Sequence, residues 1–114
     1  MQAQSCNHLQ QAEHFIKEGK FDTAEKEGLA ALTRSPKSPP GDAALMTLGL
    51  IRVHYANPKK DYHKALEYFQ RLEKDFPQSS LVEDAKVWSG VLQAFEKAKQ
   101  VDIEIEGKKK ELGK

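Results

Sequence analysis

Histidine is the side chain here with most scope for catalysis or metal binding, and it occurs at His8, His14, His54 and His63. Two zinc ligands on one helix face need a spacing of four residues, and no two of these histidines have it. His14 and Glu18 do have it, but an exposed ion pair on a helix has the same spacing. The sequence contains no glycine-rich phosphate loop and no nucleophile elbow. We therefore expect no catalysis, no metal site and no cofactor.

The bulk composition narrows the class of protein. The 114 residues include 18 basic and 17 acidic side chains, which gives a formal net charge of +1. A nucleic-acid-binding protein would normally show a basic excess, so we expect no nucleic-acid partner. No apolar run approaches the roughly 18–20 residues that span a bilayer. The length suits one small domain that covers residues 1–114.

Residues of the same or similar type recur at a constant offset of 41 residues along much of the chain. A constant offset over a long span indicates one supersecondary unit used twice. We expect a first repeat at about residues 5–38 and a second at about residues 42–79. The matched pairs are Phe21/Tyr62, Ala24/Ala65, Ala31/Leu72, Pro36/Pro77, Ser38/Ser79, Ala44/Ala85 and Gly49/Gly90.

Apolar residues recur at helical spacing through both copies. We expect five helices, at about residues 5–18, at 21–34, from about 42, at 62–75 and at 80–112. Gly19 should end the first helix, and the proline-rich segment 35–41 should separate the second from the third. Asp42 is expected to cap the third helix.

Small and aromatic residues recur in the second copy at Gly49, Tyr62, Ala65, Phe69, Leu72 and Pro77. This pattern resembles the tetratricopeptide repeat. The resemblance implies an all-α, right-handed solenoid of helical hairpins, with two repeats and a long C-terminal capping helix. It also implies that Gly49 and Ala65 meet at a close helix crossing. The first copy is weaker, because Ala12 replaces the glycine and Gly28 replaces the aromatic Phe69.

The segment from Phe76 to Gly90 is similar to the inter-repeat linker of bacterial envelope proteins, namely outer-membrane assembly lipoproteins and the periplasmic coordinator associated with the Tol–Pal system. This similarity implies a periplasmic location, with possible outer-membrane anchoring through a lipid on Cys6, the only cysteine. The small Ser5 before it fits a signal-peptide cleavage site. The alternative is an ordinary half-buried thiol at the start of the first helix. A cytoplasmic location is the alternative to the periplasm.

On the tetratricopeptide pattern, the first helix of each unit lines the concave face. Here that face is more apolar than grooves that hold charged peptide tails, and it suits an amphipathic helix or an apolar peptide. A second copy of the chain is another candidate occupant, and a third interpretation is that these residues only pack on each other. The predicted lining consists of Leu9, Glu13, Ile16, Lys17, Met46, Leu50, Val53, His54, Val87 and Val91.

The last helix has no second helix to complete its unit, so we expect it to cap the array. Lys86, Ser89 and Gln93 would face the missing partner, and we expect this face to be wet. The stripe assigned to packing on the preceding helix is Ala85, Trp88, Leu92 and Phe95.

A second apolar stripe on the last helix continues beyond the first. It consists of Val87, Val91, Ala94, Ala98, Val101, Ile105 and Leu112. A heptad stripe with nothing to cover it is typical of a helix that meets another helix, and Ala98, Val101, Ile105 and Leu112 are the expected contact residues. Fraying beyond Lys99 is the alternative.

We expect a non-catalytic scaffold or adaptor that binds a protein or peptide, from a bacterial cell envelope. Membrane contact would come only through a lipid on Cys6. One alternative is a self-associating structural subunit that forms a homo-oligomer through the last helix. Another is a cytoplasmic co-chaperone-like module that clamps a charged peptide terminus. Such a clamp needs basic residues along the groove, and only Lys17 and Arg52 lie near it.

Overall fold

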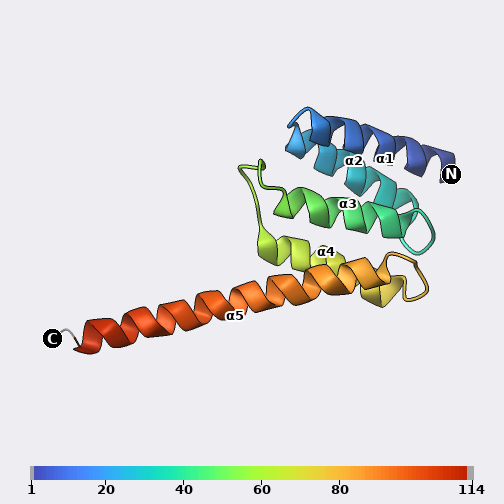
Figure 1. Ribbon diagram of the computed structural model, residues 1–114. Helices are drawn as coiled ribbons and strands as arrows, with labels where there is room; N and C mark the ends of the chain where they lie inside the picture. The colour runs from blue at the N-terminus through green and yellow to red at the C-terminus, as the bar shows by residue number, and fades with distance from the viewer. Residues whose placement is uncertain (1, 113–114) are drawn as a thin grey trace.

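Five α-helices make up the part of the chain that the structure describes, and no strand occurs in that part (Figure 1). This computed structural model describes the backbone of residues 2–112 and the side chains of residues 4–100 and 104–108. The expectation of an all-α protein with five helices is confirmed. The helices are α1 (Gln2–Lys17), α2 (Phe21–Arg34), α3 (Gly41–Val53), α4 (Tyr62–Asp75) and α5 (Val82–Leu112).

Three helices begin at positions that differ slightly from expectation, at residue 2 for α1, 41 for α3 and 82 for α5. Pro40 is the N-cap of α3, so the prediction that Asp42 caps this helix is wrong. The Asp42 carboxylate instead accepts a hydrogen bond from the Ala43 N–H at 2.9 Å and one from the Ser79 hydroxyl at 2.5 Å. The second bond joins α3 to the turn before α5.

Two helix ends follow from local chemistry. Gly19 has a φ of 77°, a left-handed conformation that favours glycine, and the Lys20 N–H donates to the Phe15 carbonyl at 2.8 Å. This Schellman arrangement ends α1 where the sequence predicts. Asp61 is the N-cap of α4, and its side chain accepts from the Lys64 N–H at 3.0 Å.

Each helix packs against the next along the chain, and α1 also packs against α3 (Figure 1). Helix α5 packs on α4 and then continues well past the other helices (Figure 1). Every described side chain from residue 93 onward is exposed. The molecule is accordingly elongated, with principal extents of 64 × 31 × 17 Å.

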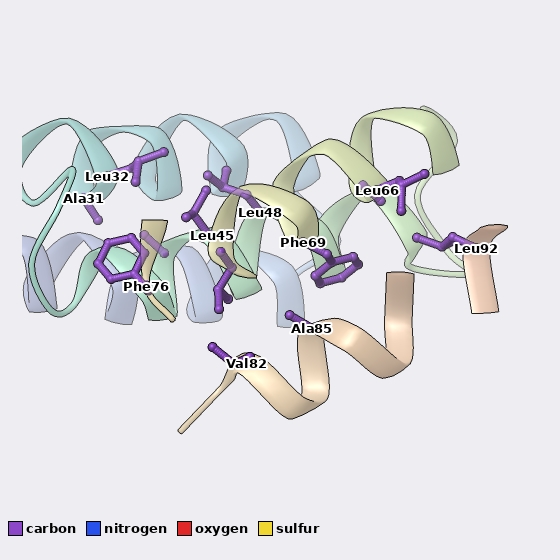
Figure 2. Packing of buried hydrophobic residues seen from close by; sticks show 13 residues of the cluster. Ala31, Leu32, Leu45, Leu48, Leu66, Phe69, Phe76, Val82, Ala85 and Leu92 are labelled. Carbon is purple, nitrogen blue, oxygen red and sulfur yellow. The ribbon is translucent and has the colours of Figure 1, made fainter. Parts of the chain in front are cut away.

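Phe69 of α4 lies at the centre of the core (Figure 2). It is fully buried, and a Cβ built on Gly49 of α3 would lie 2.4 Å from its Cε1 atom. Trp88 of α5 stacks on the same ring, with centroids 5.7 Å apart and 12° between the planes. One aromatic side chain therefore holds α3, α4 and α5 together. Ala65, also fully buried on α4, belongs to the same cluster.

The first repeat fills the corresponding position in another way. Gly28 of α2 stands where Phe69 stands in the second repeat, and a Cβ on Gly28 would lie 2.9 Å from Leu48 Cδ2. Leu48 of α3 is fully buried and occupies this space. The missing aromatic is thus replaced by a leucine from the next helix.

The stripe of α5 assigned to packing on α4 is confirmed in its main features. Ala85 and Leu92 are buried, and Trp88 is half-buried against the core. Phe95 makes an edge contact with Tyr62, with centroids 5.2 Å apart, but keeps 49% of its surface exposed.

The prediction of a wet face at Lys86, Ser89 and Gln93 is wrong for Ser89. Ser89 is 6% exposed, and its hydroxyl donates to Oε2 of Glu73 on α4 at 2.9 Å. Lys86 and Gln93 are exposed as expected. A serine is small enough to lie at the edge of the contact between α4 and α5. There its hydroxyl bonds to Glu73, a contact that the sequence does not predict.

An ion pair joins the loop between α2 and α3 to Asp75 at the end of α4, and Arg71 of α4 pairs with the same carboxylate. Lys37 Nζ lies 3.0 Å from Oδ1 of Asp75, and Arg71 Nε lies 3.3 Å from Oδ2. The hydrogen bond from Lys37, supported by the one from Arg71, holds the pKa of Asp75 below its ordinary value.

We predict that Gly49→Ala destabilises the protein by about 1–3 kcal/mol, because the added methyl group must displace the Phe69 ring from a filled core. Gly90, the repeat partner of Gly49, provides the control, since no atom lies within 4 Å of a Cβ built there. Gly90→Ala should stabilise α5 by about 0.5–1 kcal/mol. Urea unfolding followed by circular dichroism measures both changes, and equal effects would contradict the close approach.

We predict that Asp75→Asn lowers stability at neutral pH. Because the folded-state pKa of Asp75 lies below its unfolded value, its stabilisation is present above pH about 4 and is lost as pH falls through the folded pKa. The difference between wild type and variant should therefore shrink as the pH falls below about 4, and it should vanish once Asp75 is protonated in the folded protein. Thermal melts across this pH range test the prediction, and a difference that persists unchanged in acid would refute it.

Candidate functional site

The predicted groove residues of α1 and α3 lie on two helices that pack directly against each other. Leu9, Met46 and Val53 are half-buried and pack against the main core cluster. Ile16 is half-buried against a second cluster, which consists of Phe21, Ala24 and Ile51. These four residues therefore contribute to the core as well as to the surface.

Leu50 is the most exposed apolar member of this set on α3, with 37% of its surface accessible. It follows Met46 by four residues and precedes Val53 by three, so the three side chains share one face of the helix. Glu13 and Lys17 of α1 are exposed. The face of α3 thus presents an apolar side chain between two half-buried ones.

His54 closes the end of α3 rather than projecting as a free ligand-binding group. Its ring lies 4.8 Å from the Phe21 ring and 4.8 Å from the Tyr55 ring, centroid to centroid. Its Nδ1 atom accepts a hydrogen bond from the Ala56 N–H at 3.1 Å. These contacts assign His54 a structural role at the helix end.

Helix α5 carries the remaining predicted residues. Val87 and Val91 are 64% and 55% exposed. Their helix, α5, packs against α4. Ala98 and Ile105 are also exposed. The side chains of Val101 and Leu112, two of the predicted contact residues, lie outside the described residues.

A half-buried ion pair between Arg52 and Glu25 joins α3 to α2. Arg52 donates from Nε to Oε2 of Glu25 at 2.6 Å and from Nη2 to Oε1 at 2.8 Å. Its Nη1 also donates to the Lys59 carbonyl at 3.1 Å. The hydrogen bonds with Glu25 raise the pKa of Arg52, and burial, together with the Glu25 charge, raises the pKa of Tyr68. The sequence does not predict this pair, because its members are 27 residues apart.

A second cluster that was not predicted from the sequence lies where α4 begins beside α5. His63 Nε2 is 3.6 Å from Oε1 of Glu67, and His63 Nδ1 is 3.6 Å from Oε1 of Glu96. The spacing of four residues between His63 and Glu67 was a usable signal. A hollow of about 460 Å³ adjoins this cluster, lined by Lys60, Asp61, Tyr62, His63, Phe95, Glu96 and Lys99.

Among the described residues, no group of three or more histidine, cysteine or acidic side chains is arranged to hold a metal ion. His14 pairs with Glu18 as an exposed i,i+4 ion pair, as expected. His8 Nδ1 lies 2.6 Å from Oε2 of Glu27, which links α1 to α2. Within the same part of the chain, no helix combines the length and apolar character required to cross a bilayer.

Cys6 is a free thiol in α1 and is exposed, so the alternative of a half-buried thiol is wrong. The side chain of Ser5 beside it is fully buried, and its Oγ lies 2.9 Å from Oγ of Ser35 at the end of α2. Ser5 therefore faces the protein interior, whereas Cys6 faces solvent.

Comparison with protein-family models, with curated proteins and with solved structures finds no match.

We predict that Arg52 and Glu25 are energetically coupled by about 1–2 kcal/mol, because each half-buried charge loses its partner when the other is removed. The measurement is a double-mutant cycle with Arg52→Gln and Glu25→Gln in urea unfolding. Lys59, in the loop after α3, and Asp22 of α2 form an exposed pair at 3.0 Å and serve as the control. Their coupling should be below about 0.5 kcal/mol. Equal coupling in the two cycles would contradict the structural role of Arg52.

Proposed function

We propose that this chain is a non-catalytic protein-interaction module, built from two tetratricopeptide-type helical hairpins and a capping helix. Three observations support this architecture. The sequence repeats at an offset of 41 residues. Helix α1 packs on α3 in addition to the packing of consecutive helices. The backbone of Gly49 lies against the Phe69 ring. Stacked units of this kind usually present binding surfaces.

The binding surface in this proposal is the α3 face that carries Met46, Leu50 and Val53. The observation that carries the proposal is the 37% exposure of Leu50 between two half-buried apolar side chains. Leu9 and Ile16 on the adjacent α1 add further half-buried apolar surface. Apolar side chains at this spacing suit the apolar face of an amphipathic helix from a protein partner.

A clamp for a charged peptide terminus is less well supported, because Arg52 is already engaged. Its guanidinium makes two hydrogen bonds to Glu25 and one to the Lys59 carbonyl. Lys17 is then the exposed cation of the predicted lining, and Glu13 lies one helical turn before it. Opposite charges so close together provide no net attraction for a carboxylate.

An envelope location rests on the resemblance of residues 76–90 to envelope-protein linkers, and a cytoplasmic location is the alternative. The buried contact of Ser5 with Ser35 weighs against acylation of Cys6. Cleavage before Cys6 would remove Ser5 and leave the buried Ser35 hydroxyl without this partner.

The experiment that tests this function is selection of peptides from a random display library on the wild-type protein, followed by affinity measurement on two variants. Leu50→Glu places a charge on the proposed surface. Leu29→Glu is the control, because Leu29 of α2 is similarly exposed, at 41%. Both variants should keep the helical circular dichroism spectrum, since both side chains are exposed.

We predict that the selected peptides are amphipathic helices and that Leu50→Glu weakens their binding at least about tenfold, because an unpaired carboxylate would be buried in the complex. Leu29→Glu should leave the affinity unchanged. Peptides that bind the Leu50→Glu variant as tightly as the wild type would remove this face from consideration.

A further inference from the structure

A stripe of exposed apolar side chains runs along α5. Val87, Val91 and Ile105 are 64%, 55% and 45% exposed, and Ala94 and Ala98 are exposed as well. In the sequence, Val101 lies between Ala98 and Ile105, so that the spacings from residue 87 to residue 105 alternate between four and three. Leu112 follows Ile105 by one heptad. The stripe therefore extends over more than three heptads, on a helix of 31 residues.

A heptad stripe of this length, flanked by charges, is the pattern of a helix in a coiled coil. In heptad terms Val91, Ala98 and Ile105 occupy a positions, and Val87 and Ala94 occupy d positions. Helix α4 covers the neighbouring side of α5 through Ala85, Trp88 and Leu92 but leaves this stripe open. The stripe is therefore free to pack against a helix of another chain.

We propose that the stripe pairs with α5 of a second copy of this chain, in antiparallel orientation. This inference is independent of the peptide-binding function proposed for α3. Two features of the described side chains support it, the sizes of the residues along the stripe and the charges beside it.

Residue size favours the antiparallel over the parallel orientation. A parallel pair would place each residue opposite itself, so that two successive layers would contain only Ala94 and Ala98, and Lys108 would face the partner's Lys108. In the antiparallel pair, Ala94 faces the partner's Ile105, and Lys108 faces the partner's Val91. Facing small with large side chains fills a helix interface, and separating the lysines removes a like-charge contact.

The flanking charges match the antiparallel arrangement. Lys97 and Glu104 are exposed, and both occupy the g position that immediately precedes an a position of the stripe. In an antiparallel pair g positions face g positions, so Lys97 of each copy faces the partner's Glu104. The surface is thus complementary to itself about a two-fold axis, as a symmetric dimer requires. A partner of unrelated sequence has no reason to share this match.

The position of α5 in the molecule leaves room for such a pair. The other helices lie beside the first part of α5, and the remainder extends past them (Figure 1). An antiparallel partner would therefore place its own body at the opposite end of the paired helices. Its free helical end would lie along Val87 and Val91 of the first copy.

The experiment that tests the pairing is sedimentation equilibrium of the full chain and four variants. Wild type should dimerise, with a mass twice the 12.9 kDa of the monomer. Lys97→Glu or Glu104→Lys alone creates two like-charge contacts and should weaken the dimer about tenfold. The double variant restores opposite charges and should recover wild-type association. Lys99→Glu, which is off the stripe, should have no effect.

Two outcomes would overturn the proposal. A wild-type chain that stays monomeric at millimolar concentration would exclude the pairing. A double variant no better than the single ones would exclude the antiparallel register.

Disulfide trapping tests the orientation directly, in a Cys6→Ser background that removes the native thiol. Mixing the Ala94→Cys and Ile105→Cys chains under mild oxidation should give a cross-linked heterodimer. Neither chain alone should cross-link efficiently, because position 94 does not face position 94 of the partner. Efficient cross-linking of Ala94→Cys with itself would show a parallel pair and contradict the proposal. Circular dichroism of every variant checks that α5 remains helical.

Discussion

The structure depends most on the close approach between the backbone of Gly49 and the ring of Phe69. The distance of 2.4 Å between a Cβ built on Gly49 and Cε1 of Phe69 means that no larger residue fits on α3 without movement of the core. The face of the ring carries Trp88 of α5, which stacks at 5.7 Å. Phe69 of α4 therefore contacts both neighbouring helices, and it fixes how α3 and α5 each pack on α4. The apolar face of α3 and the open stripe of α5 are both positioned by it.

Much of this architecture follows from the sequence, because a repeat places its small and large residues at fixed offsets. The bounds of α2 and α4 and the left-handed Gly19 were predictable from apolar periodicity and turn chemistry. Two expectations failed for physical reasons. Ser89 is buried because its hydroxyl finds Glu73, and Asp42 accepts from Ser79 instead of capping α3. Contacts of this kind join residues far apart in the chain.

The sequence predicts which residues share the candidate surface but not how exposed each of them is. Spacing placed Met46, Leu50 and Val53 on one face, yet only the packed structure separates the exposed Leu50 from its half-buried neighbours. The engagement of Arg52 by Glu25 has no local sequence signal, and it changes which ligand the surface suits. The partner chemistry we infer is apolar for this reason.

Nuclear magnetic resonance of the α-protons of Gly49 tests the central contact most directly, because an aromatic ring at this distance shifts and relaxes nearby protons strongly. If the Phe69 ring lies against Gly49, the Gly49 α-protons should have ring-shifted resonances and nuclear Overhauser effects to that ring, and the Gly90 α-protons should show neither. Gly49 α-protons at ordinary helical shifts, without contact to the Phe69 ring, would contradict this close approach.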